Sequence, residues 1–286
     1  MKKFHPMICL ILLVLIPACS TTTLKTLKVF ISVDMEGLAG VVSGQECGPS
    51  GPDYPYFRKI MTLETNAAIE GALAAGATEI VVRDGHGSKN NIIPDLLNRR
   101  AKLLRGLTDR PENMMLGVDD SFQAVLLIGY HAKAGTDQGV IAHTSTGNVV
   151  DFSVNDVSLP EAGYNAIIAG LHNVPIVFVS GDNWICAQVK AMLGEVEVFE
   201  TKTGMRTAEL GLHPDEVRDG IRQGVTGALR NLGRYAPYKL HPPYNMVLKV
   251  KTEKIVYPGA TRSENGVFTF TSSDFLEVMD AFNKMK

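Results

Sequence analysis

The chain has little of several features that would assign it to a special class of protein. Its 286 residues carry 28 Lys and Arg against 30 Asp and Glu, a formal net charge of −2, so the basic excess typical of nucleic-acid binding is lacking. The 27 glycines and 14 prolines are scattered without a repeat, which excludes collagen-like and low-complexity chains. Hydrophobic residues make up 45% of the sequence, too many for a disordered chain. These absences leave a globular enzyme or a ligand-binding protein.

Cysteine is also scarce, with four residues in the whole chain. Cys9 and Cys19 fall in the N-terminal apolar region, so only Cys47 and Cys186 belong to the predicted globular part. Neither is in a Cys-x-x-Cys motif or beside a predicted base, which argues against a redox motif and a cysteine nucleophile. We expect two separate thiols, with a disulfide between them as the alternative in an oxidising compartment.

The longest apolar run, residues 7–16, is too short for a membrane span, which needs roughly 20 residues. Two lysines precede this run and a small residue follows it, the pattern of a secretory signal. Residues 16–19, Ile-Pro-Ala-Cys, resemble a bacterial lipobox, in which the cysteine becomes the lipidated first residue of the mature chain. We expect a lipoprotein signal peptide over 1–18 and a tether over 19–26, with a plain signal peptide as the alternative. The protein is then exported to the periplasm or cell envelope and held to a bacterial membrane through lipid on Cys19.

Strand-like runs and helical segments alternate along the rest of the chain. Strands are predicted at 27–33, 79–82, 124–128, 149–154, 176–179 and 196–199, and helices at 56–75, 160–171, 214–232 and before Met192. Short apolar strands separated by helices are typical of an α/β protein with a mostly parallel sheet flanked by helices. After Pro242 and Pro243 the pattern becomes β-rich, and a last helix begins at Ser273. We predict an α/β domain over 27–240 and a smaller C-terminal α+β portion over 241–286.

Acidic and histidine residues follow the first three predicted strands, at the same end of each. Asp34 and Glu36 come after the first strand, His86 after the second and His131 after the third. In an open parallel sheet, ligands bind beyond the carboxyl ends of the strands. Asp34 and Glu36 are two residues apart and project to one face of an extended backbone. Two carboxylates and two imidazoles that converge there predict a site for a metal such as zinc.

Four further residues are candidates for the same site. Glu161 follows Pro160 at a predicted helix start, where an acid also suits the positive end of the helix dipole, so both interpretations stay open. His143 lies in a loop of small residues and is a candidate general base or nucleophile. Lys202 and Arg206 are candidates for holding a substrate carboxylate or an oxyanion. Solvated surface charge is the alternative for both, and it is favoured for Arg206.

Four short motifs resemble those of the DppA-type D-aminopeptidases. They are Ser32-Val33-Asp34-Met35-Glu36-Gly37, Asp84-Gly85-His86, Gly129-Tyr130-His131-Ala132 and Glu161-Ala162-Gly163-Tyr164-Asn165, and their order and spacing agree with that family over about residues 29–202. The resemblance implies a zinc metallopeptidase with two metal ions per subunit, bound by Asp34, Glu36, His86, His131 and Glu161, of which Asp34 bridges the ions. It also implies that His143 is the catalytic histidine, although Thr144 stands where the family has serine.

The same resemblance implies an aminopeptidase that hydrolyses short peptides with an N-terminal D-amino acid. It further implies a ring-shaped homo-oligomer. Two alternatives remain from the residues themselves: a dinuclear metal hydrolase of another bond, such as a phosphoester or amide, and a solute-binding lipoprotein. A solute-binding protein needs no converging acids and histidines, so bound zinc would argue against it. The expected partners are small D-amino-acid-containing peptides and no nucleic acid, with membrane contact only through Cys19.

Overall fold

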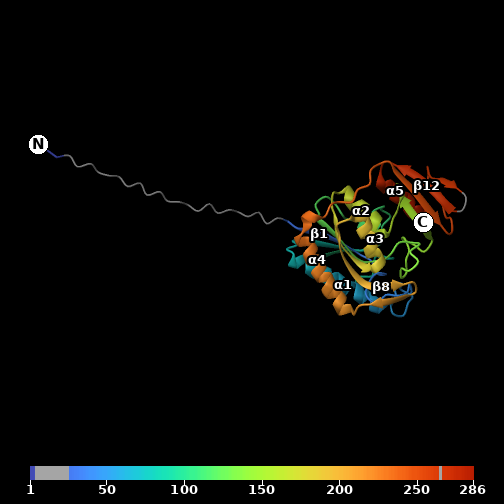
Figure 1. Ribbon diagram of the computed structural model, residues 1–286, viewed down its shortest axis with the longest axis horizontal. Helices are drawn as coiled ribbons and strands as arrows, with labels where there is room; N and C mark the ends of the chain where they lie inside the picture. The colour runs from blue at the N-terminus through green and yellow to red at the C-terminus, as the bar shows by residue number, and fades with distance from the viewer. Residues whose placement is uncertain (4–25, 264–265) are drawn as a thin grey trace.

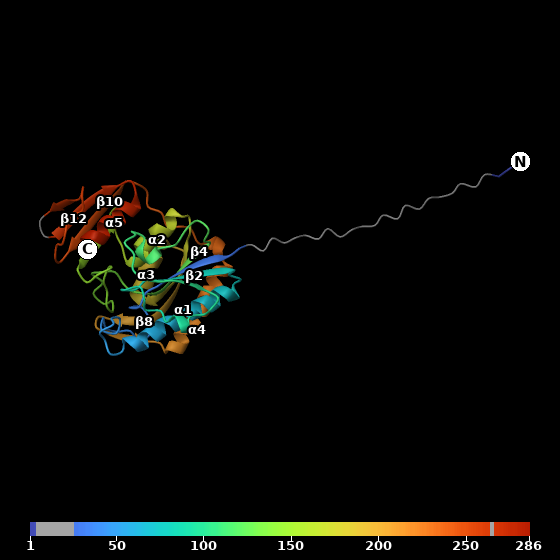
Figure 2. The same cartoon turned by 180° about the vertical axis from the view of Figure 1, so that it is seen from behind.

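Two β-sheets with flanking helices make up the described part of the chain (Figures 1 and 2). The computed structural model describes residues 1–3, 26–263 and 266–286, so most of the predicted signal peptide and tether lies outside the described residues. No helix in the described part is long and apolar enough to cross a membrane. The strands are β1 (Lys28–Val33), β2 (Glu79–Asp84), β3 (Lys102–Leu104), β4 (Ala124–Tyr130), β5 (Val149–Val154), β6 (Val157–Ser158), β7 (Ile176–Asp182), β8 (Glu197–Met205), β9 (Ala208–Gly211), β10 (Tyr244–Val250), β11 (Thr261–Ser263) and β12 (Val267–Ser272). The α-helices are α1 (Tyr54–Ala74), α2 (Glu161–Leu171), α3 (Asn183–Leu193), α4 (Pro214–Arg230) and α5 (Phe275–Met285), with 3-10 turns η1 (Pro94–Leu96), η2 (Asn113–Met115) and η3 (Leu232–Arg234).

The larger sheet has seven strands in the order β3-β2-β1-β4-β7-β8-β9. Its neighbouring strands are parallel, except that β8 and β9 form an antiparallel hairpin at one edge. Helices α1 and α4 pack on one face of this sheet, and α2 and α3 pack on the other (Figure 1). The predicted fold class, α/β with a mostly parallel sheet flanked by helices, is thereby confirmed.

The residues of β1 show why both faces of the larger sheet are covered. Val29, Ile31 and Val33 belong to the hydrophobic cluster of α1 and α4, whereas Phe30 belongs to the cluster that contains α2 and α3. Successive side chains of a strand alternate between the two faces, so a strand that is apolar throughout needs a partner on each face. With helices on both faces, the loops at the carboxyl ends of the strands are left to carry polar groups.

The smaller sheet is antiparallel and combines strands from two distant parts of the chain. Its order is β11-β12-β10-β5-β6, so β5 from the middle of the chain pairs with β10. The predicted boundary between 240 and 241 therefore separates strands that belong to one sheet. Strands β5 and β6, within residues 149–158, therefore complete the sheet of the C-terminal α+β portion.

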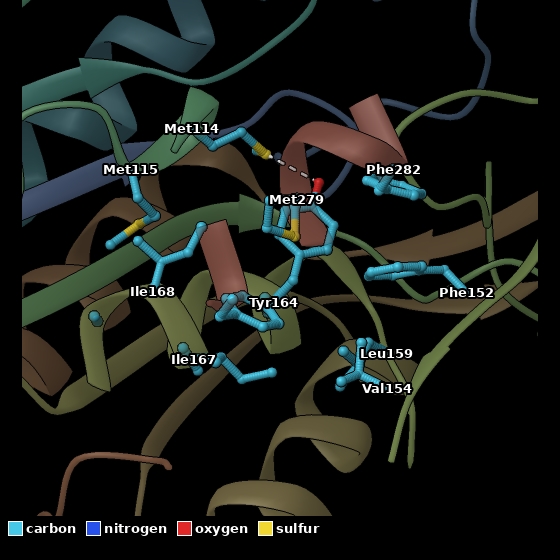
Figure 3. Close-up of a cluster of buried hydrophobic side chains, with 14 of the residues drawn as sticks. Met114, Met115, Phe152, Val154, Leu159, Tyr164, Ile167, Ile168, Met279 and Phe282 are labelled. Atoms are coloured by element: carbon cyan, nitrogen blue, oxygen red, sulfur yellow. Dashed lines mark hydrogen bonds between the residues drawn. The ribbon is translucent and has the colours of Figure 1, made fainter. Parts of the chain in front are cut away.

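One hydrophobic cluster joins the smaller sheet to the larger one (Figure 3). Phe152 of β5 stacks on Phe282 of α5 with 4.1 Å between the ring centroids, and Tyr164 of α2 packs edge-on against Phe152. Met114 and Met279 lie in the same cluster. The cluster fixes α5 against α2, and the last turn of α5 thereby reaches the site at the carboxyl ends of the strands.

Candidate metal centre

The three central strands of the larger sheet bring the candidate ligands together. Strands β2, β1 and β4 are adjacent and parallel, and the residues at their carboxyl ends are in register. The candidate ligands stand just beyond these ends and at the start of the next helix: Asp34 and Glu36 after β1, His86 after β2, His131 after β4 and Glu161 as the first residue of α2. The structure therefore assembles at one edge all five residues that the motifs indicated.

Gly37 allows the chain after β1 to run directly against β4. Its N–H donates to the Gly129 carbonyl oxygen at 2.8 Å, and a Cβ at this position would lie 1.8 Å from the Tyr130 carbonyl oxygen. No side chain can be accommodated at that distance unless the backbone moves. Because Glu36 is the preceding residue, this close approach holds its carboxylate over the strand ends, which gives the Asp-x-Glu-Gly order a structural reason.

Asp34 lies between two groups of candidate ligands. On one side, His86 Nδ1 is 3.1 Å from Asp34 Oδ1 and 3.1 Å from Glu36 Oε2. On the other side, His131 Nε2 is 3.5 Å from Asp34 Oδ2 and 3.5 Å from Glu161 Oε1. In each group, one ligand atom from each of three residues lies within 4.8 Å of the other two. A carboxylate that offers one oxygen to each group is placed to bridge two ions.

Each of the two histidines in these groups is oriented by a backbone carbonyl group. His86 Nε2 is 2.8 Å from the Cys47 carbonyl oxygen, and His131 Nδ1 is 3.0 Å from the Ala132 carbonyl oxygen. A ring nitrogen that faces a carbonyl oxygen carries a proton, so in the neutral ring the other nitrogen keeps its lone pair for a metal ion. Both rings are therefore held in the tautomer that a metal ligand requires.

Two buried atoms of the cluster lack the partner that a cation would supply. Asp34 Oδ2 and His131 Nε2 are buried and have no hydrogen-bond partner among the described residues. Burial, together with the Glu36 charge, raises the pKa of Asp34 to about 6. Burial by itself lowers the pKa of His131, but the adjacent Glu161 carboxylate and the other acids outweigh it and raise this pKa to about 10. The buried acids therefore stabilise a positive charge in the cluster. Carboxylate and imidazole donors are also the ligands that zinc takes in proteins, so the cluster fits zinc.

His143 reaches the same carboxylates from the loop between β4 and β5. Its Nε2 lies 3.7 Å from Glu161 Oε1 and 3.9 Å from Glu36 Oε1, and its ring stacks on that of His131 with 4.1 Å between centroids. The His143 side chain is 20% exposed, against 1% for His131. Its Nδ1 faces the Ile141 carbonyl oxygen at 2.8 Å, which leaves Nε2 free for proton exchange. Glu36, His131 and His143 also form a third group with metal-ligand spacing.

A cavity of about 220 Å³ opens over this cluster. It is lined by the candidate ligands other than His131, by His143 and by two lysines, Lys89 and Lys286. Its volume is below the roughly 300–1,000 Å³ typical of small-molecule sites, which fits a short substrate. The sequence analysis missed both lysines. One sequence feature could have indicated Lys89, namely its position three residues after His86. No sequence feature indicated Lys286, because only the packing of α5 brings it to the cavity.

Lys202 and Arg206 do not line the cavity. The Lys202 ammonium group is buried, donates to the Glu36 carbonyl oxygen at 2.9 Å and pairs with Glu209 at 3.0 Å. It supports the backbone beside a candidate ligand and has no access to a substrate in the cavity. Arg206 is exposed and pairs with Asp137, which is the solvated position that the sequence favoured.

Cys47 and Cys186 are buried and free, as expected for two separate thiols. Burial raises the pKa of each thiol well above its ordinary range. A thiolate nucleophile is therefore disfavoured at both positions. Cys47 contributes to the site through its carbonyl oxygen, which orients His86.

Comparison with known proteins identifies the family to which this arrangement belongs. The model of the M55 peptidase family, described as D-aminopeptidase, matches residues 27–284. The chain belongs to this family. A curated relative, the D-aminopeptidase of Bacillus subtilis strain 168, is 32% identical over 265 residues, which cover 89% of this chain and 95% of the relative. A solved structure, that of the zinc-dependent D-aminopeptidase DppA from Bacillus subtilis, a self-compartmentalizing protease, has a TM-score of 0.86 and 29% identity, and the match covers 90% of this chain and 96% of that one.

Membership of the M55 family confirms the resemblance that the four motifs indicated. The family match runs from β1 to α5 and thus includes both sheets. The smaller sheet and α5 are therefore part of the same family unit as the strands that carry the candidate ligands. The donor set of three carboxylates and two imidazoles also agrees with the zinc dependence of the solved relative.

Proposed function

We propose that this M55 family member is a zinc-dependent D-aminopeptidase that hydrolyses short peptides with an N-terminal D-amino acid. Two zinc ions per subunit would be held by Asp34, Glu36, His86, His131 and Glu161. One observation carries this proposal: Asp34 is shared by two groups of ligand atoms, in a chain whose family is that of D-aminopeptidases. The relatives are peptidases, which favours this function over phosphoester hydrolysis and over solute binding.

Both the metal and the side chains around it contribute to the proposed hydrolysis. Zinc at this cluster supplies polarisation of the scissile carbonyl group and a water of lowered pKa. His143 has the most exposed imidazole side chain of the cluster, and its Nε2 takes up and returns a proton at the scissile bond. The Ile141 carbonyl oxygen holds the His143 ring in the tautomer that this transfer needs. The free amine of the substrate would dock at the metal cluster, so cleavage takes place next to the N-terminal residue.

Hydrolysis of matched D- and L-alanyl substrates by the zinc-loaded protein tests this function. We expect turnover of D-alanyl-D-alanine and of D-alanine p-nitroanilide, and no turnover of p-nitrophenyl phosphate. Zinc removal by a chelator should abolish the activity, and added zinc should restore it. Equal rates on the D and L isomers would contradict the stereochemical assignment. Hydrolysis of the phosphate ester alone would establish the alternative hydrolase instead.

We also propose that the chain assembles into a ring-shaped homo-oligomer. The solved relative is self-compartmentalizing, and the β8–β9 hairpin of this chain exposes Met205 and Leu210, followed by exposed Leu212. Apolar side chains on a hairpin at the edge of a sheet are typical of a surface that another subunit covers. Sedimentation equilibrium should then give a mass several times the 31.0 kDa of one chain. A mass of one chain at all concentrations would contradict assembly.

Export with a lipid anchor is a further proposal, supported by the basic residues, apolar run and Ile-Pro-Ala-Cys sequence near the N-terminus. Two acyl chains on Cys19 suffice for stable anchoring at about 0.8 kcal/mol per buried methylene. We expect the activity in the membrane fraction of cells, and release of active protein by Cys19→Ser. A soluble wild type, or a Cys19→Ser protein that stays with the membrane, would contradict the anchor and leave the peptidase function untouched, because the candidate ligands begin at Asp34.

A further inference from the structure

Two lysines share the cavity with the acidic cluster, and the reaction described above gives them no role. Lys89 lies in the loop after β2 and is 8% exposed, and Lys286 follows directly on α5 and is half-buried. Both line the cavity that also contains Asp34, Glu161 and His143. Two ammonium groups from distant parts of the chain therefore lie within reach of a molecule bound at the metal cluster.

Neither ammonium group forms an ion pair with a carboxylate in the part of the chain that the structure describes. Lys89 donates to the Gly85 carbonyl oxygen. Lys286 donates to the Ser145 hydroxyl group and, at 2.8 Å, to the Asn283 side-chain oxygen. An ammonium group has three N–H donors, so both lysines keep donors that these described partners do not use.

The surroundings of Lys286 favour an incoming anion. Burial, together with the Lys89 charge, lowers the pKa of Lys286 to about 8 from its ordinary value of 10.5, and the Glu161 carboxylate offsets only part of this shift. A negative group bound between the two lysines would offset both the desolvation and their mutual repulsion. Ser145 ties this region to the metal cluster, since its side chain accepts from Lys286 and its backbone N–H donates to Glu161 at 2.6 Å.

The cavity thus brings the metal cluster and two ammonium groups together within about 220 Å³. The metal cluster would receive the free amine of the substrate, and the two lysines attract a carboxylate. A dipeptide carries both groups with one peptide bond between them, whereas a longer peptide places its terminal carboxylate farther away. This arrangement favours peptides short enough for the amine to reach the metal cluster while the terminal carboxylate reaches the two lysines.

We propose that Lys89 and Lys286 bind the terminal carboxylate of the substrate and so select dipeptides and other very short peptides with a free carboxyl end. This inference rests on the proposed D-aminopeptidase function and specifies its substrate class. Lys89 and Lys286 then determine substrate specificity, although neither belongs to the metal cluster.

Two substrates that differ in one group provide the test: D-alanyl-D-alanine and D-alanyl-D-alaninamide, in which an amide replaces the terminal carboxylate. The measured quantity is the ratio of kcat/KM for the acid to kcat/KM for the amide. The wild type should favour the acid by about tenfold to a hundredfold, the usual contribution of a charged hydrogen-bond partner. In Lys286→Met and in Lys89→Met the ratio should fall by a similar factor.

Lys284→Met is the matched control, because Lys284 lies on α5 two residues before Lys286 but its side chain is 53% exposed and pairs with Asp280 at 2.7 Å. The ratio of the control should equal that of the wild type, and all variants should bind as much zinc as the wild type. A Lys286→Met protein with an unchanged ratio, with equal losses on both substrates, or with lost zinc would overturn the inference. A wild type that hydrolyses neither substrate would instead refute the proposed function, and this inference with it.

Discussion

Replacing His131 by alanine is expected to remove about one zinc ion per subunit and nearly all peptidase activity. The His131 side chain is 1% exposed, and its Nε2 lies 3.5 Å from both Asp34 and Glu161, so its loss removes one donor from the group that it forms with these two carboxylates. Loss of a hydrogen-bond partner of a metal ligand already costs roughly 10–100-fold in affinity or activity, and loss of the ligand itself should cost more. Elemental analysis and kcat/KM on D-alanyl-D-alanine give the two readouts.

His241→Ala is the control for this experiment, because His241 is an exposed histidine in the segment before β10. It should keep the zinc content and activity of the wild type. His131→Ala should also keep the fold, which circular dichroism of the helices that cover the sheet can check. Full zinc and full activity in folded His131→Ala would refute the assignment of His131 as a ligand.

Replacing His143 by alanine is expected to leave both zinc ions bound and to lower kcat by about 10²–10⁴-fold, the usual contribution of a general acid–base group. His143 Nε2 is 3.7–3.9 Å from the carboxylates of Glu161 and Glu36 and reaches the cavity. It is therefore placed to act on the substrate, whereas Asp34 and His131 are the proposed metal ligands. Zinc content and kcat measured on the same preparation separate the two roles.

The opposite result for His143 has a defined structural meaning. Glu36, His131 and His143 have the spacing of a metal-ligand group. If His143→Ala lost zinc in step with activity, that group would be a metal site and His143 a ligand. Retained zinc with unimpaired turnover would remove His143 from the mechanism altogether.

The sequence predicted those strands and helices that show a local pattern of apolar residues. The apolar run over 27–33 became β1, and the helical spacing over 56–75 became α1 with two more residues at its start. It did not predict the β8–β9 hairpin, because residues 200–204 are polar or glycine and carry no hydrophobic signal, although Thr201 and Lys202 are buried. It placed the smaller sheet only after residue 241, because the pairing of β5 with β10 joins segments about a hundred residues apart and leaves no mark in either.

The candidate metal site could also be predicted from the sequence, because most of its residues directly follow predicted strands. Asp34, His86 and His131 follow parallel strands, and the rule for such sheets brings them to one edge without any knowledge of side-chain packing. Lys286 reaches that edge through the contacts of Phe282 and the rest of α5 with the core, which no local pattern encodes. Lys202 has the charge of a substrate-binding residue but is turned toward the Glu36 carbonyl oxygen, a direction that only the fold determines.

The position of zinc in crystals of the zinc-loaded protein, located by anomalous scattering at the zinc edge, tests the central claim most directly. The account predicts two peaks per subunit, about 3.5–4 Å apart as in other two-metal sites. One peak should be bounded by Asp34, Glu36 and His86, and the other by Asp34, His131 and Glu161. A single peak, or zinc bound away from Asp34, would contradict the account.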